Sequence, residues 1–125
     1  CIGVNNQYRG LDPASFRLEL EQLVQEARLL LAGPPDGLVL LSIPDWGVSP
    51  FARDRDREAI AREVDAFNAV VRTVALTPQV PFLDWTPLAR SFAGQPEAFA
   101  PDGLHPSASQ HKAWATFLAD SQLGC

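Results

Sequence analysis

The sequence predicts an α/β protein built on a parallel sheet, and two observations lead to this class. Short apolar segments alternate with amphipathic ones in the order strand, helix, strand, helix, strand, loop, helix. The segment Leu38-Val39-Leu40-Leu41-Ser42-Ile43 is almost wholly apolar, which is typical of a strand that is covered on both faces. Such an alternation favours parallel strands joined by right-handed crossovers. We therefore expect one α/β domain over residues 1–125.

The first elements are predicted from their boundary residues. Cys1-Ile2 has the character of the end of a strand. Asp12 followed by Pro13 is typical of an N-cap with proline at the first helical position. Apolar residues then recur at helical spacing: Phe16, Leu20, Leu23, Ala27, Leu30 and Leu31. This helix should end before Gly33-Pro34-Pro35, which cannot continue it, and the apolar strand that follows should end at Pro44.

A second helix is expected at about residues 54–75. Four apolar residues would share one of its faces: Ile60, Val64, Phe67 and Val71. Charges of both signs alternate over residues 53–58, which is typical of a solvated helix start. The segment Val80-Pro81-Phe82-Leu83-Asp84 is a further candidate strand, in which Pro81 fits the start or an edge.

The C-terminal segment is predicted to be a loop and then a helix. Residues 86–101 hold three of the eleven prolines. Ser107 and Gln110 have the spacing of a capping box, and Trp114, Phe117 and Leu118 would form the apolar face of the helix. With Cys1-Ile2 the chain supplies about three strands, fewer than a doubly wound domain needs. We therefore expect the domain to be incomplete at its N-terminus.

Composition excludes some classes of function. The net charge of −5 and the isoelectric point near 4.8 argue against a nucleic-acid partner. No segment approaches the ~18 apolar residues that cross a bilayer. The sequence has two histidines and neither HExxH nor CxxC, so a zinc site is not expected. It has no Walker A and no Gly-x-Gly-x-x-Gly motif, so no cofactor is expected either. For Cys1 and Cys125, unpaired thiols are favoured over a disulfide.

The segment Asp102-Gly103-Leu104-His105-Pro106 is the strongest candidate for chemistry. An aspartate three residues before a histidine, in a loop with glycine, can hold the imidazole by one nitrogen and leave the other free. Pro106 biases His105 toward an extended backbone. Ligands bind beyond the carboxyl ends of parallel strands, where we expect this loop, residues 3–6 and residues 45–47 to meet. The pattern predicts the base and the orienting acid of a Ser-His-Asp system; a surface histidine beside an acid is the alternative.

Other polar and aromatic residues have weaker patterns. The Asn5 amide could donate to an oxyanion, although many such asparagines only make a local turn bond. Trp46 and Tyr8 are candidates for lining a substrate pocket. Trp85 and Trp114 are expected to pack helices against the sheet, and His111 is expected to be exposed. There is no Gly-x-Ser-x-Gly, so the nucleophile elbow is absent.

Two motifs resemble blocks of the SGNH hydrolases, also called GDSL esterases and lipases. Gly3-Val4-Asn5-Asn6 resembles the third block, Gly-x-Asn-Asp, with Asn6 where the family usually has aspartate. Asp102-Gly103-Leu104-His105-Pro106 resembles the fifth block, Asp-x-x-His. The resemblance implies that His105 is the base, Asp102 orients it and Asn5 is an oxyanion donor. It also implies a flavodoxin-like three-layer α/β/α sandwich with about five parallel strands, and hydrolysis of esters through an acyl-enzyme without metal or cofactor. We place Asn6 on the substrate side.

The resemblance also predicts what this sequence lacks. The blocks with the nucleophilic serine and a glycine oxyanion donor would lie upstream of Cys1. No serine stands in a Gly-Asp-Ser context; the serines are Ser15, Ser42, Ser49, Ser91, Ser107, Ser109 and Ser121. We therefore expect the 125-residue chain alone to be inactive and to need a missing segment of the same domain, besides a small ester substrate. A non-catalytic α/β binding module and, less favoured, a lyase or transferase on a flavodoxin-like sheet stay open.

Overall fold

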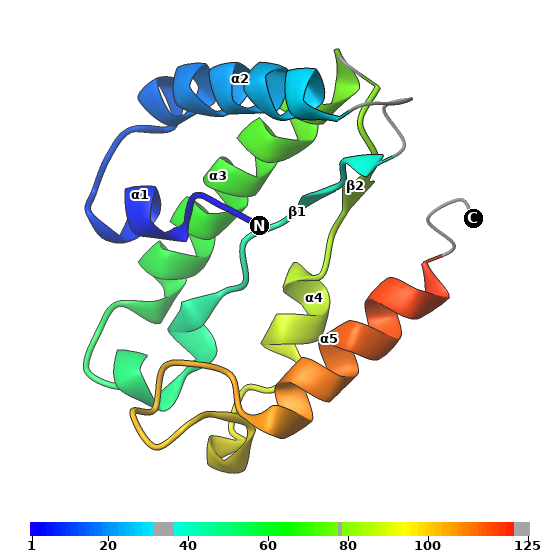
Figure 1. Ribbon diagram of the computed structural model, residues 1–125. Helices are drawn as coiled ribbons and strands as arrows, with labels where there is room; N and C mark the ends of the chain where they lie inside the picture. Colours follow the sequence, from blue (N-terminus) through cyan, green and yellow to red (C-terminus); the bar gives the residue numbers. More distant parts are fainter. Residues whose placement is uncertain (32–36, 78, 122–125) are drawn as a thin grey trace. The chain divides into compact units, whose positions relative to one another are not determined.

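The computed structural model describes residues 1–31, 37–77 and 79–121 (Figure 1). By their internal contacts the residues fall into two compact units. The first unit comprises Cys1–Ile43 and Glu63–Asp84, and the second comprises Pro44–Arg62 and Trp85–Cys125. Each unit is described by itself.

The helix α2 (Pro13–Leu30) of the first unit begins as its sequence predicts. The Asp12 side chain accepts a hydrogen bond from the Ser15 amide at 2.9 Å, and Pro13 occupies the first turn. Such a cap satisfies an amide that has no partner within the helix. Of the predicted apolar residues, Phe16 and Leu20 are buried, whereas Leu23 and Leu30 are exposed. Val24, which was not predicted, is also buried. The helix ends before residues 33–35, which lie outside the described residues.

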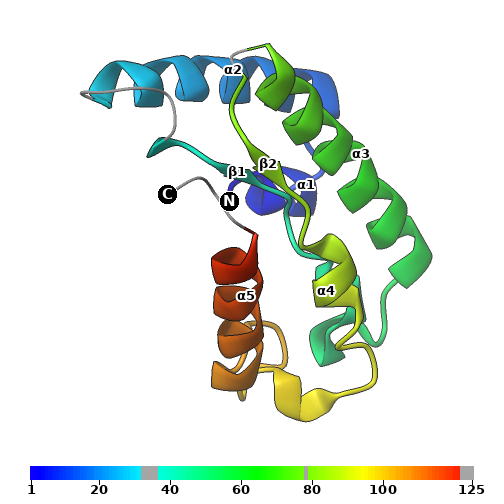
Figure 2. The same ribbon diagram turned by 90° about the vertical axis from the view of Figure 1, so that its right-hand side faces the viewer.

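Two short strands confirm the parallel pairing. β1 (Leu40–Leu41) pairs with β2 (Phe82–Leu83), with Leu40 opposite Phe82. The two strands lie side by side in both views of the ribbon (Figures 1 and 2). The strands are shorter than the apolar segments that predict them, and Pro81 lies just before β2, where its lack of an amide proton is tolerated. The chain is thus of the α/β class, whereas the three-layer sandwich stays a prediction.

The predicted strand at Cys1-Ile2 is wrong. Residues 1–3 are in neither strand nor helix, and the chain then enters α1 (Val4–Tyr8). Gly3 has a φ of +117°, and a Cβ there would lie 2.6 Å from the Phe16 ring. Glycine therefore permits both the turn and the close approach to α2. The described residues hold two strands rather than about three, because apolar side chains alone do not supply a ladder partner.

The core of the first unit lies between α2 and the part of α3 (Arg57–Leu76) that belongs to this unit. Both views show α2 lying across this part of α3 (Figures 1 and 2). The rings of Phe16 and Phe67 are 5.0 Å apart. All four apolar residues predicted for one face of α3 are buried: Val64, Phe67 and Val71 in the first unit and Ile60 in the second. Asn68 on the same helix bonds to both backbone groups of Ile43, at 2.7 and 3.1 Å, and so ties α3 to the chain after β1.

The second unit begins with two short 3-10 helices, Trp46–Val48 and Pro50–Ala52, followed by the start of α3. α3 begins three residues later than predicted, because the Asp56 side chain accepts from the Ala59 amide at 2.8 Å. Residues 86–101 are less loop-like than predicted. They include α4 (Thr86–Arg90) and a 3-10 helix (Pro96–Ala98), since a proline is tolerated in the first turn of a helix.

The last helix, α5 (Ala108–Asp120), begins after Ser107, but the predicted capping box is not formed. The Ser107 hydroxyl pairs with that of Ser109 at 2.8 Å, and Gln110 donates to the Ala98 carbonyl at 3.0 Å. The glutamine side chain that the capping box requires therefore bonds to the Ala98 carbonyl instead. The rings of Trp85 and Trp114 lie 4.7 Å apart within the second unit, and their predicted packing against the sheet stays a prediction. No helix within the described ranges is long and apolar enough to cross a membrane.

Candidate functional site

Asp102 and His105, called the dyad below, are joined by a side-chain hydrogen bond in the loop before α5. Asp102 Oδ2 lies 2.5 Å from His105 Nδ1. Asp102 Oδ1 accepts from the backbone amides of Leu104 at 2.9 Å and of His105 at 3.0 Å. These bonds, first that of the imidazole and then those of the amides, lower the pKa of Asp102 from 3.8 to about 2. The carboxylate is therefore ionised at neutral pH.

One ring nitrogen of His105, Nε2, takes no part in the contact with Asp102. An ionised Asp102 can only accept, so the proton of a neutral imidazole lies on Nδ1 and leaves the lone pair on Nε2. The side chain of His105 is 72% exposed and that of Asp102 is 50% exposed. Nε2 is therefore open to a second partner, which is the arrangement that the Asp-x-x-His spacing predicts.

The backbone of the loop is closed by short-range bonds. The amide of Gly103 donates to the Ala100 carbonyl at 2.8 Å, and the amide of Ala100 donates to the His105 carbonyl at 2.7 Å. Phe99 and Pro106 form an isolated antiparallel bridge on either side of these bonds. Gly103 has a φ of +71°, a conformation that side chains disfavour. The glycine in the motif is thus required by the turn that brings Asp102 back to His105.

A second segment of the same unit supports this loop. The Phe51 amide donates to the Gly103 carbonyl at 2.9 Å, and a Cβ on Gly103 would lie 3.3 Å from Pro50 Cβ. Pro50 and Phe51 are not among the residues that the sequence predicts for the site. The one relevant feature of the sequence is the glycine inside the Asp-x-x-His motif, which permits a close approach without identifying the neighbour.

The candidate aromatic residue Trp46 is buried in the second unit. Its ring lies 6.2 Å from that of Phe51, which is exposed. The Arg55 guanidinium lies over both rings, at 5.6 Å from Trp46 and 5.2 Å from Phe51. Because Phe51 bonds to Gly103, this aromatic pair is adjacent to the dyad loop.

Asn5, Asn6 and Tyr8 lie on α1, in the first unit. The predicted turn is a short helix, in which Asn5 and Tyr8 are exposed. Asn6 Nδ2 donates to Glu19 Oε2 at 2.9 Å, and so bonds to α2. The structure brings Asp102 and His105 together within the second unit. The grouping of the α1 residues with the dyad stays a prediction.

The remaining candidates have mixed outcomes. His111 is exposed on α5 as predicted, with Nδ1 lying 3.0 Å from the Ser107 carbonyl oxygen. Cys1 Sγ lies 3.6 Å from the Ser42 carbonyl oxygen. Cys125 lies outside the described residues, so the pairing state of the two cysteines stays a prediction. Within the part of the chain that the structure describes, no three His, Cys, Asp or Glu side chains are grouped as metal ligands.

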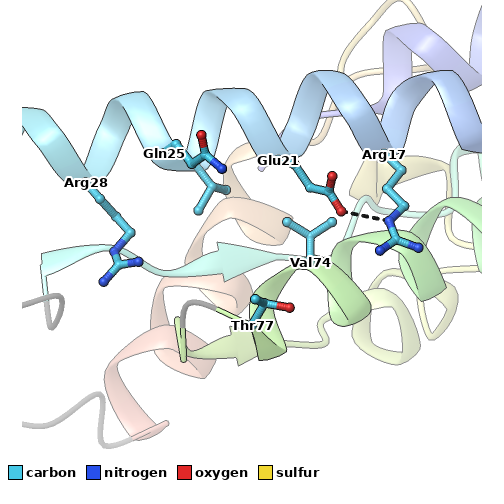
Figure 3. Close-up of a pocket in the computed structure, with 7 residues that line it drawn as sticks. Arg17, Glu21, Gln25, Arg28, Val74 and Thr77 are labelled. Carbon is cyan, nitrogen blue, oxygen red and sulfur yellow. Dashed lines mark hydrogen bonds and ion pairs between the residues drawn. The ribbon is translucent and has the colours of Figure 1, made fainter.

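Two described pockets differ in their relation to the dyad. One of about 410 Å³ lies between α2 and α3 in the first unit (Figure 3). It holds none of the predicted site residues; its lining is Arg17, Glu21, Val24, Gln25, Arg28, Val74 and Thr77. Another, of about 110 Å³, belongs to the second unit, and two of its lining residues are Pro50 and Phe99. Pro50 contacts Gly103 and Phe99 pairs with Pro106, so this smaller pocket borders the dyad loop.

In hydrolases that activate a serine, an aspartate holds the histidine by one ring nitrogen, and Asp102 holds His105 in the same way. The sequence matches the GDSL-like Lipase/Acylhydrolase family over residues 1–113. The chain therefore belongs to this family. The matched range includes both residues 3–6 and the dyad. No curated protein and no solved structure matched the chain.

Proposed function

We propose that this chain supplies the base and the orienting acid of a serine hydrolase that cleaves carboxylic esters through an acyl-enzyme. The observation that carries the proposal is the 2.5 Å contact between Asp102 Oδ2 and His105 Nδ1, with the rest of the imidazole exposed. Membership of the GDSL-like Lipase/Acylhydrolase family supports hydrolysis as the reaction class.

In the proposed reaction, His105 Nε2 accepts the hydroxyl proton as the serine oxygen attacks the ester carbonyl. Asp102 stabilises the imidazolium that forms. The imidazolium then gives its proton to the departing alcohol, which leaves an acyl-enzyme. Water attacks this intermediate with His105 again as the base, so that the acid is released and the serine is restored. General acid–base catalysis of this kind contributes about 10²–10⁴-fold in rate.

The nucleophile is assigned to a segment outside the 125 residues, because no serine here follows Gly-Asp. Two of the serines, Ser42 and Ser49, are also fully buried. Ser49 Oγ donates to the Trp46 carbonyl at 2.6 Å. The missing segment of the same domain is thus the macromolecular partner that the proposal requires.

Four further residues are assigned to the substrate side. Asn5 is the proposed oxyanion donor, and its exposure on α1 supports that role. Asn6, Tyr8 and Trp46 are proposed to contact the ester. The contact between Trp46 and Phe51 supports the assignment of Trp46, because Phe51 bonds to the dyad loop.

The test compares ester turnover by the 125-residue chain with turnover by a longer product of the same gene that carries Gly-Asp-Ser. The short chain should give no turnover and no labelling by a fluorophosphonate, whereas the longer product should give both. Turnover by the short chain would contradict the proposal. So would a longer product whose activity survives His105→Ala with the fold intact.

A non-catalytic α/β binding module is the second candidate. It is favoured by the bonding of His105, since the described hydrogen bonds of its side chain involve Asp102 and no serine. In a binding module, His105→Ala would leave ligand binding and the fold unchanged. The same variant therefore separates the two functions.

A further inference from the structure

Asp45, which follows β1, is a buried carboxylate with both oxygens hydrogen-bonded. Its side chain is 3% exposed, and Oδ2 accepts from Arg90 Nε at 2.8 Å. Oδ1 accepts from the Gly47 amide at 2.9 Å, and Arg90 Nη2 also donates to the Ala61 carbonyl at 3.3 Å. A buried carboxylate is costly unless it is paired and hydrogen-bonded. The position of residue 45 is therefore coupled to that of Arg90 on α4.

The chain after Asp45 is fixed over its next residues. A Cβ on Gly47 would lie 2.9 Å from Asp45 Oδ1 and 3.1 Å from Ile60 Cγ2, so only glycine allows this amide to approach the carboxylate. Ser49 Oγ donates to the Trp46 carbonyl at 2.6 Å. Arg57 donates to the carbonyls of residues 49 and 52, at 3.4 and 3.3 Å. Residues 46–52, called the platform below, are thus held at both ends.

The platform contacts the dyad loop at one glycine. The Phe51 amide donates to the Gly103 carbonyl, and the backbone of Gly103 packs against Pro50. The bonds among Ala100, Gly103 and His105 set the shape of the loop, but they lie within the loop itself. The contact with Pro50 and Phe51 joins the loop to a separately held segment, and Asp102 is the residue immediately before Gly103.

We propose that Asp45 and Arg90 are positioning residues for the dyad: they fix the platform, and the platform seats Gly103 and with it Asp102 and His105. The inference rests on the proposed function only in giving the dyad a catalytic role. The geometric coupling is measurable on the chain without any turnover.

The first variant to measure is Asp45→Asn, which keeps the size of the side chain and an acceptor for the Gly47 amide but loses the charge pairing with Arg90. The readouts are the NMR resonance of the His105 Nδ1 proton and the hydrogen exchange of the Leu104 and His105 amides, which bond to Asp102. Exchange of both amides should be about tenfold faster than in the wild type, and the Nδ1 proton signal should weaken or shift. The double variant Asp45→Asn with Arg90→Gln, which restores a neutral hydrogen-bonded pair, should recover part of the protection.

The chain offers a matched control in Asp84→Asn. Asp84 directly follows β2, and its Oδ2 accepts from Arg72 Nη2 at 2.9 Å; its side chain is 35% exposed, against 3% for Asp45. The control should leave the exchange of both loop amides unchanged. If the control accelerated the exchange of the loop amides as much as Asp45→Asn does, the inference would be wrong, because the loss of any aspartate charge would then have the same effect.

The inference also fails if Asp45→Asn keeps its fold and the exchange of Leu104 and His105 is that of the wild type. If Asp45→Asn does not fold, Arg90→Lys, which retains the charge but not the planar guanidinium, provides the same readouts. Normal loop exchange in folded Arg90→Lys would then count against it, and faster exchange would support it. Absence of ester turnover would contradict the proposed function and leave these measurements unaffected, so the two failures are distinguishable.

Discussion

Asp102 and Asp45 both accept hydrogen bonds through both carboxylate oxygens, yet their partners and surroundings differ. The Asp102 side chain is half exposed and faces an imidazole. The Asp45 side chain is buried and faces the guanidinium of Arg90, which keeps its charge at every accessible pH. A charge pair that persists at every accessible pH suits a contact that holds two segments of the chain in place. An imidazole that gains and loses a proton suits a reaction step.

The largest expected effect follows from removing the imidazole. In a protein that carries the serine, His105→Ala should lower kcat by about 10⁴-fold or more, with the fold retained because the side chain is exposed. Steady-state ester hydrolysis and circular dichroism measure the two quantities. If the variant kept an activity within tenfold of the wild type, the contact of Asp102 with His105 would be structural, like that of Asp45 with Arg90, and not catalytic.

Asp102→Asn removes the charge but keeps the shape of the orienting residue. We expect a loss of about 10³–10⁴-fold in kcat, because the amide no longer favours the Nδ1–H tautomer. The change in the free energy of unfolding at neutral pH should be small compared with the change that an Asp45 substitution causes. Parallel kinetics and urea denaturation test this, and a loss of stability without a loss of kcat would contradict it.

Arg90→Met should have the largest effect on stability. It leaves the Asp45 carboxylate buried without its charged partner, which costs about 3 kcal/mol in free energy of unfolding. Urea denaturation followed by tryptophan fluorescence measures the loss. A change below about 1 kcal/mol would mean that water replaces the guanidinium and that the pair does not hold the two segments in place.

The pH dependence of stability should identify Asp102. Its pKa is lowered from 3.8 to about 2 in the folded chain, so its stabilising contribution is present above pH 3.8 and is lost as the pH falls through about 2. The difference in unfolding free energy between the wild type and Asp102→Asn should therefore shrink over that interval. NMR titration of the carboxyl carbon checks the pKa directly, and a value near 3.8 would show that the dyad bond is not formed in solution.

The smallest effect is expected for Glu21→Gln on α2, whose ion pair with Arg17 at 2.8 Å is exposed. Pairs of this kind on a helix surface are worth about 0.3–0.5 kcal/mol. Urea denaturation beside Arg90→Met would give the range between an exposed pair and a buried one. A comparable loss from both variants would remove burial as the cause.

The sequence predicts best what neighbouring residues decide. The start of α2 at Asp12-Pro13 and the bond between Asp102 and His105 each depend on residues within three positions, and both are present. The buried face of α3 follows from its periodicity. The pairing of Asp45 with Arg90 and the contact of Phe51 with Gly103 join distant segments without a repeat or motif, so no local pattern could predict them. The false strand at residues 1–2 and the unformed capping box have the same cause, because tertiary partners decide both.

The short separation between Asp102 and His105 has a consequence for how the chain folds. Their contact closes a separation of three residues, whereas that of Asp45 with Arg90 closes one of 45. Closing the longer loop costs about 2 kcal/mol more in chain entropy. The dyad contact can therefore form within the first fast events of folding, before the segment that seats it is in place. When the rest of the domain assembles, its contacts therefore have only to stabilise the pairing of this histidine with this aspartate, because the pair has already formed.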